Sequence, residues 1–125
     1  MTKVFQERLC SLLDGIDIGR DIDFQVKPFF GGAAAYVKGH MCLSLTNVGL
    51  AVKLSAVDRQ ELLQVNGARQ LQYFPNAPIK KEYVVLPDDM VNDSHTLRQW
   101  VIKSMCYVIA VSNTEHDSSI PSSAG

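Results

Sequence analysis

The side chains of this chain best suited to metal or nucleophilic chemistry are three histidines and three cysteines. The histidines are His40, His95 and His116, and the cysteines are Cys10, Cys42 and Cys106. No two histidines have the i, i+4 spacing that places two ligands on one face of a helix, and no C-x-x-C pair occurs. Each cysteine lies inside an apolar pattern, which is typical of a buried structural thiol. The sequence therefore predicts neither a metal nor a cofactor.

A second group that could bind a cation is the acidic stretch over residues 16–23. Its carboxylates belong to Asp17, Asp21 and Asp23. The stretch lacks the glycine and the terminal glutamate of a calcium-binding loop, so the sequence favours a solvated acidic connection. The chain also lacks the G-x-S-x-G turn that exposes a serine nucleophile. We expect a protein without enzymatic activity and predict no catalytic residues.

Gly31 and Gly32 inside a strand indicate a bulge, or a place where another backbone or side chain comes close. The three alanines that follow either let a helix pack tightly on the strand or leave a gap for a ligand. Lysines at positions 53, 80 and 81 either form a small cationic surface or are solvated strand-edge residues. The predicted surface for a partner or ligand comprises Phe30, Gly31, Gly32, Tyr36, Lys53, Lys80 and Lys81.

The composition is that of one soluble globular domain. The chain has 125 residues, of which 46% are apolar and 20% are charged. No apolar run approaches the roughly 18 residues of a membrane helix, and the N-terminus has no signal core, so we expect a cytoplasmic location. Lys and Arg number 12 and Asp and Glu number 13, which gives a net charge of −1. This balance disfavours a domain that binds nucleic acid by itself.

The elements that would position these residues begin with a sheet. Alternating apolar residues predict strands over Met41–Thr46 and Gly49–Leu54, and Phe24–Val37 predicts one long strand interrupted by a proline and the glycine pair. The turns between these segments predict a three-stranded antiparallel meander. Two further strands, over Gln70–Phe74 and Lys80–Leu86, would complete a sheet of five.

Three helices are predicted to cover the apolar face of this sheet. The first spans residues 2–15, where an apolar stripe recurs at helical spacing. A capping box of Ser55 and Asp58 opens a second, short helix. The third begins near Ser94 and carries Trp100 in its buried stripe.

The predicted organisation is one domain over residues 1–111 and a disordered tail over residues 112–125. The tail is rich in serine and lacks apolar periodicity. The predicted fold class is α+β, with two layers, the element order α-β-β-β-α-β-β-α and an antiparallel sheet.

Several short motifs resemble those of one family. The segment Phe29-Phe30-Gly31-Gly32 with Ala35-Tyr36 resembles the M-F-G-G-x-x-x-Y opening of the TfoX N-terminal domain. The residues Tyr83-Val-Val-Leu-Pro-Asp-Asp resemble its Y-x-x-L-P-x-D/E motif, and Leu97-Arg-Gln-Trp100 resembles its L-x-x-W ending. The M-x-L and L-x-V-K-L pieces within Met41–Leu54 are similar to its second and third strands. The resemblance spans residues 3–110.

This resemblance implies a secretion-chaperone-like α+β fold and a role near regulators of bacterial competence, which assist transcription without enzymatic activity. Regulators of that type carry a second, C-terminal domain, whereas this chain ends in a short polar tail. We therefore expect a cytoplasmic domain that acts through contacts with a protein partner, which could be a second copy of the chain. Two alternatives remain open. One is a small-molecule pocket beside Gly31-Gly32, lined by Phe30, Tyr36 and Trp100, and the other is weak direct binding of nucleic acid.

Overall fold

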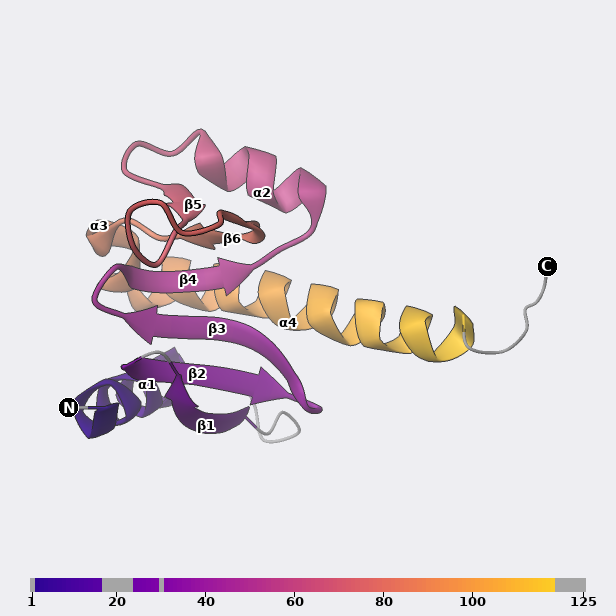
Figure 1. Ribbon diagram of the computed structural model, residues 1–125, viewed down its shortest axis with the longest axis horizontal. Coiled ribbons are helices and arrows are strands. Elements are labelled where there is room, and N and C mark those ends of the chain that lie inside the picture. The colour runs from indigo at the N-terminus through magenta and orange to yellow at the C-terminus, as the bar shows by residue number, and fades with distance from the viewer. Residues whose placement is uncertain (1, 17–23, 30, 119–125) are drawn as a thin grey trace.

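The computed structural model describes residues 2–16, 24–29 and 31–118, with side chains between residues 4 and 112 (Figure 1). These residues form four helices and one sheet of six strands. The helices are α1 (Thr2–Ile16), α2 (Ala56–Leu63), α3 (Asp88–Val91) and α4 (Ser94–Ser118). The strands are β1 (Phe24–Phe29), β2 (Gly32–Val37), β3 (His40–Thr46), β4 (Gly49–Lys53), β5 (Arg69–Leu71) and β6 (Lys80–Val85). The predicted α+β class and antiparallel sheet are confirmed.

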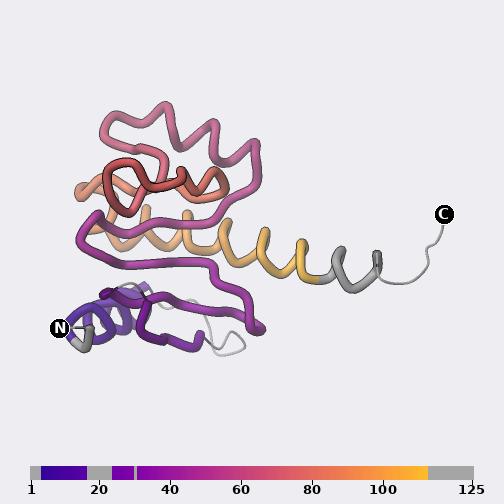
Figure 2. Tube along the Cα trace, in the orientation of Figure 1, coloured from indigo at the N-terminus to yellow at the C-terminus, as the bar shows by residue number. Residues whose placement is uncertain are grey.

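The strands lie in the order β1-β2-β3-β4-β6-β5, and each neighbouring pair is antiparallel. The Cα trace passes back and forth through β1 to β4 and then crosses by way of α2 to the far edge (Figure 2). It returns along β6, which fits between β4 and β5. The sheet therefore has two open edges, formed by β1 and by the three-residue β5.

The predicted long strand over residues 24–37 is wrong, because this segment folds back on itself as a hairpin of β1 and β2. Phe29 pairs with Gly32, and Pro28 pairs with Ala33. Gly31 has φ of +73°, a left-handed conformation that side chains other than glycine rarely adopt. The glycine pair thus marks a reversal of the chain rather than a bulge, and the meander has four strands instead of three.

Helices cover one face of the sheet. Figure 1 shows α4 crossing behind β3 and β4, and α1 lying against β1 and β2. Leu9 of α1, Leu62 of α2 and Trp100 of α4 belong to one buried cluster with the inward residues of the strands. Burial of apolar surface stabilises a fold by about 25 cal/mol per Å². This cluster is the larger of the two in the described residues and therefore supplies the main stabilisation.

A smaller cluster lies on the opposite face of the sheet, which no helix covers in Figure 1. It contains Ala51, Leu71, Tyr83 and Val85, with Tyr73 packed against them. The connection between β5 and β6 closes over this cluster, and the Tyr83 hydroxyl donates to a β3 carbonyl at 3.5 Å. The sheet is therefore apolar on both faces near β4 and β6.

The helix predictions largely agree with the structure. Ser55 caps α2, since its Oγ accepts from the backbone N–H of Asp58 at 3.3 Å. The short helix α3 was not predicted; it begins directly after Pro87, whose fixed φ suits the residue before a helix. The helix α4 continues to Ser118, past the predicted domain end at residue 111 and into the predicted tail. A helix anchored by a buried first part is extended at little cost, so apolar periodicity is not needed there. The rest of the predicted tail, residues 119–125, lies outside the described residues.

Candidate functional site

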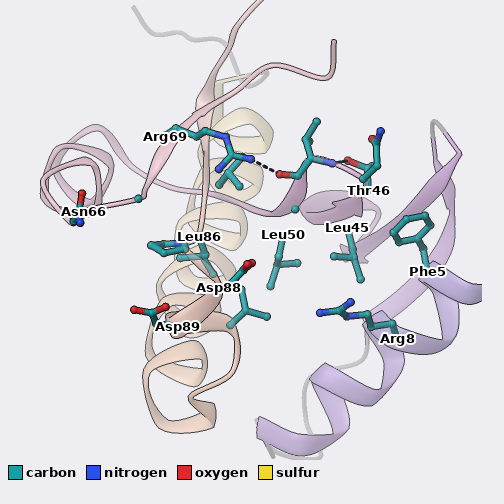
Figure 3. A pocket seen from close by; sticks show the side chains of 17 residues that line it. Phe5, Arg8, Leu45, Thr46, Leu50, Asn66, Arg69, Leu86, Asp88 and Asp89 are labelled. Carbon is teal, nitrogen blue, oxygen red and sulfur yellow. Dashed lines mark hydrogen bonds between the residues drawn. The ribbon is translucent and has the colours of Figure 1, made fainter.

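A groove of about 680 Å³ lies at the end of the sheet where the turn between β3 and β4 is located. Its floor consists of the apolar residues Leu45, Leu50 and Leu86, all nearly fully buried. Its walls come from α1, the segment before β5 and the start of α3 (Figure 3). We call this feature the turn groove.

The backbone of the turn groove is held in a defined shape by its own residues. The Val48 N–H donates to Thr46 Oγ1 at 3.3 Å, and Arg69 Nη2 donates to the Val48 carbonyl at 2.6 Å. Gly49 has φ of +120°, and a Cβ at this position would lie 3.0 Å from Val85. The turn is thus fixed from one side by an arginine of β5 and from the other by close packing on β6.

Charges of both signs surround the turn groove. The guanidinium of Arg8, an exposed residue of α1, points into it, and the carboxylates of Asp88 and Asp89 lie on the opposite wall (Figure 3). No ion pair within 4 Å joins Arg8 to either aspartate among the described residues. The described lining includes no serine, cysteine or histidine. The groove therefore presents charges of both signs around an apolar floor.

Sequence reasoning missed the turn groove because its residues come from six separate elements and the turns between them. The turn itself was predicted from its asparagine and glycine, but nothing local indicates that α1 and α3 flank it. The only local signal was the pair Asp88-Asp89 directly after a predicted strand end.

The predicted partner surface is divided between the two ends of the sheet. Gly31 and Gly32 lie at the end where β1 turns into β2, whereas Lys53, Lys80 and Lys81 lie at the opposite end of their strands. Phe30 lies outside the described residues. Tyr36 lies toward the lysine end, and the Nζ of Lys27 lies 5.0 Å from the centre of its ring.

Gly32 is a packing position and not a gap for a ligand. It is buried, and a Cβ built on it would overlap the carbonyl oxygen of Leu45. The three alanines that follow are fully buried, and the helix α1 packs on their strand. Tyr36 and Trp100, which were predicted to line a pocket here, do not line the turn groove. Trp100 is 7% exposed and belongs to the core.

The predicted lysine cluster contains an ion pair. Lys53 Nζ lies 3.5 Å from Glu82 Oε1, and the Tyr107 hydroxyl of α4 donates to Glu82 Oε2 at 3.1 Å. The pKa of Tyr107 is raised, chiefly by desolvation and then by this bond to a carboxylate. The backbone carbonyl of Lys81 accepts a hydrogen bond from Arg59 of α2. Lys81 itself is exposed.

Three further groups, Cys42, Tyr73 and Tyr83, have raised pKa values because they are buried. Desolvation raises the pKa of Cys42 from 9.0 to about 12; its thiol donates to the Ala35 carbonyl at 3.6 Å, and its carbonyl accepts from Ser104 at 3.1 Å. Desolvation also raises the pKa of Tyr73, whose hydroxyl shares a 3.1 Å hydrogen bond with the fully buried Ser44. These groups therefore keep their protons at physiological pH.

Two general limits hold for the described residues. No three His, Cys, Asp or Glu side chains lie close enough together to bind a metal ion. No described helix combines the length and the apolar character needed to cross a membrane.

Comparison with known proteins gives one match. The family model of the TfoX N-terminal domain matches residues 22–106, from before β1 into α4. No curated protein and no solved structure matches the chain significantly. The matched range covers more than half of the 125 residues and includes all six strands. The chain belongs to the TfoX N-terminal domain family.

Proposed function

We propose that this chain is a non-enzymatic cytoplasmic interaction domain that assists gene regulation, in the context of bacterial competence, by binding a protein partner. Membership of the TfoX N-terminal domain family supports a competence-related regulatory role. The contact mode is proposed from the distribution of exposed apolar side chains.

Exposed large apolar residues are concentrated in one part of the described chain. Of six such residues, five lie between positions 57 and 79, in α2, in the turn after it and in the connection between β5 and β6. We call these five the edge apolar surface: Val57, Leu63, Val65, Phe74 and Ile79. Val57 and Phe74 are 75% and 62% exposed. The sixth, Val4, is isolated on α1.

This distribution favours a protein contact at the β5 edge. Single exposed apolar residues are normal; we place the contact at this edge because five of the six described ones come from the segments next to β5. The segment also holds the short edge strand β5, whose outer backbone groups have no strand neighbour in the described sheet. A partner that covered this edge would remove apolar surface from water and satisfy those groups.

Affinity capture from the native cell tests the proposal. The bait carries Val57→Ser with Phe74→Ser, and a bait with Val4→Ser serves as the control because it removes an equally exposed valine elsewhere. We expect the wild-type and control baits to retain the same protein in equal amounts. The double variant should retain at least about tenfold less of it, because it lacks two contact residues. Equal retention by all three baits would exclude this edge. Light scattering on the purified chain shows whether the partner is a second copy.

The turn groove supports a second candidate function, the binding of a small ligand that carries both charges. Its volume falls within the range of ligand sites, and Arg8 points into it without an ion-pair partner among the described residues. A thermal-shift screen of free amino acids and dipeptides tests this function. We expect stabilisation of the wild type that Arg8→Gln removes; no shift with any compound counts against it.

A further inference from the structure

The neutral overall charge of this chain conceals a strong segregation of charge. No Asp or Glu occurs between Phe24 and Val57 or between Leu62 and Lys81, although acidic residues slightly outnumber basic ones overall. Of the described strand residues, only Glu82 is acidic. The sheet is therefore basic, and most of the negative charge lies on the helices and their connections.

The strand pairing places these basic residues on one face. Residues that pair across neighbouring strands form one row over the sheet. From β1 to β5 the row consists of Lys27, Ala34, Ser44, Ala51, Val85 and Arg69. This row crosses all six strands, with an exposed cation at each end and four buried residues between them. At about 4.8 Å between strands, the row is about 24 Å long. Ala51 and Val85 assign it to the face opposite the helices.

Two more lysines lie on the same face, and the acidic residue does not. Lys53 pairs with Tyr83 of the smaller cluster, and Lys81 precedes Tyr83 by two residues, so both side chains lie on this side of the sheet. Side chains alternate along a strand, so Glu82, which lies next to Tyr83, faces the helix side. There the Tyr107 hydroxyl of α4 donates a hydrogen bond to it. The ion pair with Glu82 holds the Nζ of Lys53 near that carboxylate, so the cations of this face that are exposed and outside any ion pair within 4 Å among the described residues are Lys27, Lys81 and Arg69.

Tyrosines lie between the cations. The hydroxyl of Tyr73 is bound to Ser44 in the middle of the row, and the Tyr73 ring meets Phe29 edge-on at 5.7 Å between centroids. Tyr36 lies beside Lys27 on the same face. Both tyrosines are partly exposed. We call the following six residues the cation–tyrosine face: Lys27, Tyr36, Lys53, Arg69, Tyr73 and Lys81.

We propose that the cation–tyrosine face binds single-stranded nucleic acid without sequence preference. Cations at both ends of the row would contact phosphates, and the exposed parts of Tyr36 and Tyr73 would stack on unpaired bases between them; basic residues and stacking rings together bind single strands in this way. An acidic protein would also contact the cations, but it has no bases to stack on the tyrosine rings between them. A duplex offers no free base faces, and the broad sheet has no element that enters a groove.

Fluorescence anisotropy with a labelled 20-nucleotide single strand tests this proposal. The measurement is made once with DNA and once with RNA, to show which of the two binds more tightly. We expect micromolar binding at 50 mM NaCl. Three phosphate contacts predict a log–log salt slope of about −2, and so about a 20-fold loss of affinity at 200 mM. The same sequence as a duplex and a poly-glutamate of equal charge are expected to bind at least about tenfold more weakly, because neither offers stacking.

Variants separate the charge contribution from the stacking contribution. Lys27→Gln with Lys81→Gln should weaken binding and reduce the salt slope by about 1.4, since each single-strand phosphate contact contributes about 0.7. Tyr36→Leu should weaken binding at least about fivefold, while Tyr36→Phe, which keeps the ring, should retain it. Lys103→Gln removes one positive charge from α4 and should leave the affinity unchanged. Circular dichroism confirms that each variant is folded.

Three results would overturn the proposal. The first is no binding of either strand type at 50 mM NaCl and 100 µM protein. The second is equal affinity for the duplex or for poly-glutamate, which would assign the face to nonspecific anion contacts or to an acidic protein. The third is an equal loss of affinity in Lys103→Gln and in the Lys27 and Lys81 double variant.

Discussion

At the scale of single residues, burial explains which groups are structural. Gly32 packs against a neighbouring strand so closely that no side chain fits. Cys42, whose pKa is raised by desolvation, is enclosed between β2, β3 and α4. The sequence predicted the buried thiol correctly from its apolar context, but Cys10 and Cys106 are exposed. Each of those two lies at a solvent-facing position of a helix, which a local apolar pattern does not distinguish from a buried one.

Replacing Gly32 with alanine should destabilise the fold by about 1–3 kcal/mol, because the new Cβ would collide with the Leu45 carbonyl and the strands must shift. Urea denaturation measures this change in the free energy of unfolding. Gly15→Ala is the matched control: nothing lies within 4 Å of its Cβ position, and it is inside α1. That variant should be neutral or more stable by up to about 1 kcal/mol. Equal destabilisation by both variants would contradict the account.

The three thiols should differ in reactivity. Cys10 and Cys106 are exposed and should react with a disulfide reagent at pH 8, whereas the buried Cys42 should react only after denaturation. Counting released thiolate with and without denaturant measures this difference. The variant Cys42→Ala should show the same number of reactive thiols in both conditions. Fast labelling of three thiols in the native protein would mean that Cys42 is accessible.

Alkaline pH should destabilise the protein. Burial raises the pKa of Cys42 from 9.0 to about 12 and also raises that of Tyr73 and Tyr83. The folded state then keeps protons that the unfolded state releases above about pH 9, so stability is full below that pH and falls as pH rises toward the folded pKa values. Thermal unfolding at pH 7.5, 9 and 10.5 measures this fall. The fall should be smaller in Cys42→Ala, and a melting temperature that does not change up to pH 10.5 would contradict the burial of these groups.

At the scale of elements, apolar periodicity identified the long helices and most strands, and it failed where a turn lay inside an apparent strand. The segment from Phe24 to Val37 has a strand-like composition throughout, so only the left-handed conformation of Gly31 reveals the reversal. The strand predicted over Gln70–Phe74 ends at Leu71, because Tyr73 leaves the strand to bond Ser44. Both differences arise from long-range contacts, which local patterns do not contain.

The central helix α4 should be the largest single contributor to the core. Trp100 is 7% exposed and packs in the main cluster, so Trp100→Ala should cost about 3–5 kcal/mol of unfolding free energy. Denaturation in urea measures this cost. The neighbouring exposed residue provides the control, since Gln99→Ala should change stability by less than about 0.5 kcal/mol. A loss below 1 kcal/mol for Trp100→Ala would show that this helix does not anchor the sheet.

At the scale of the whole molecule, the sequence predicted the class of the fold and the family but not the surfaces that could act. The predicted partner residues are divided between two ends of the sheet, because the glycines lie at the start of β2 whereas the lysines lie at the end of β4 and the start of β6. The turn groove, the edge apolar surface and the cation–tyrosine face each combine segments whose proximity depends on the strand order. The placement of β6 between β4 and β5, which no local pattern specifies, brings these segments together.

The central claim is that the β5 edge contacts a protein partner, and site-specific photocrosslinking in the native cell tests it most directly. A photoreactive amino acid at position 74 replaces a phenylalanine that is 62% exposed, and the same group at position 4 replaces a valine that is 64% exposed. The account predicts a discrete protein adduct from position 74 and none from position 4. No adduct from position 74, or the same adduct from both positions, would contradict it.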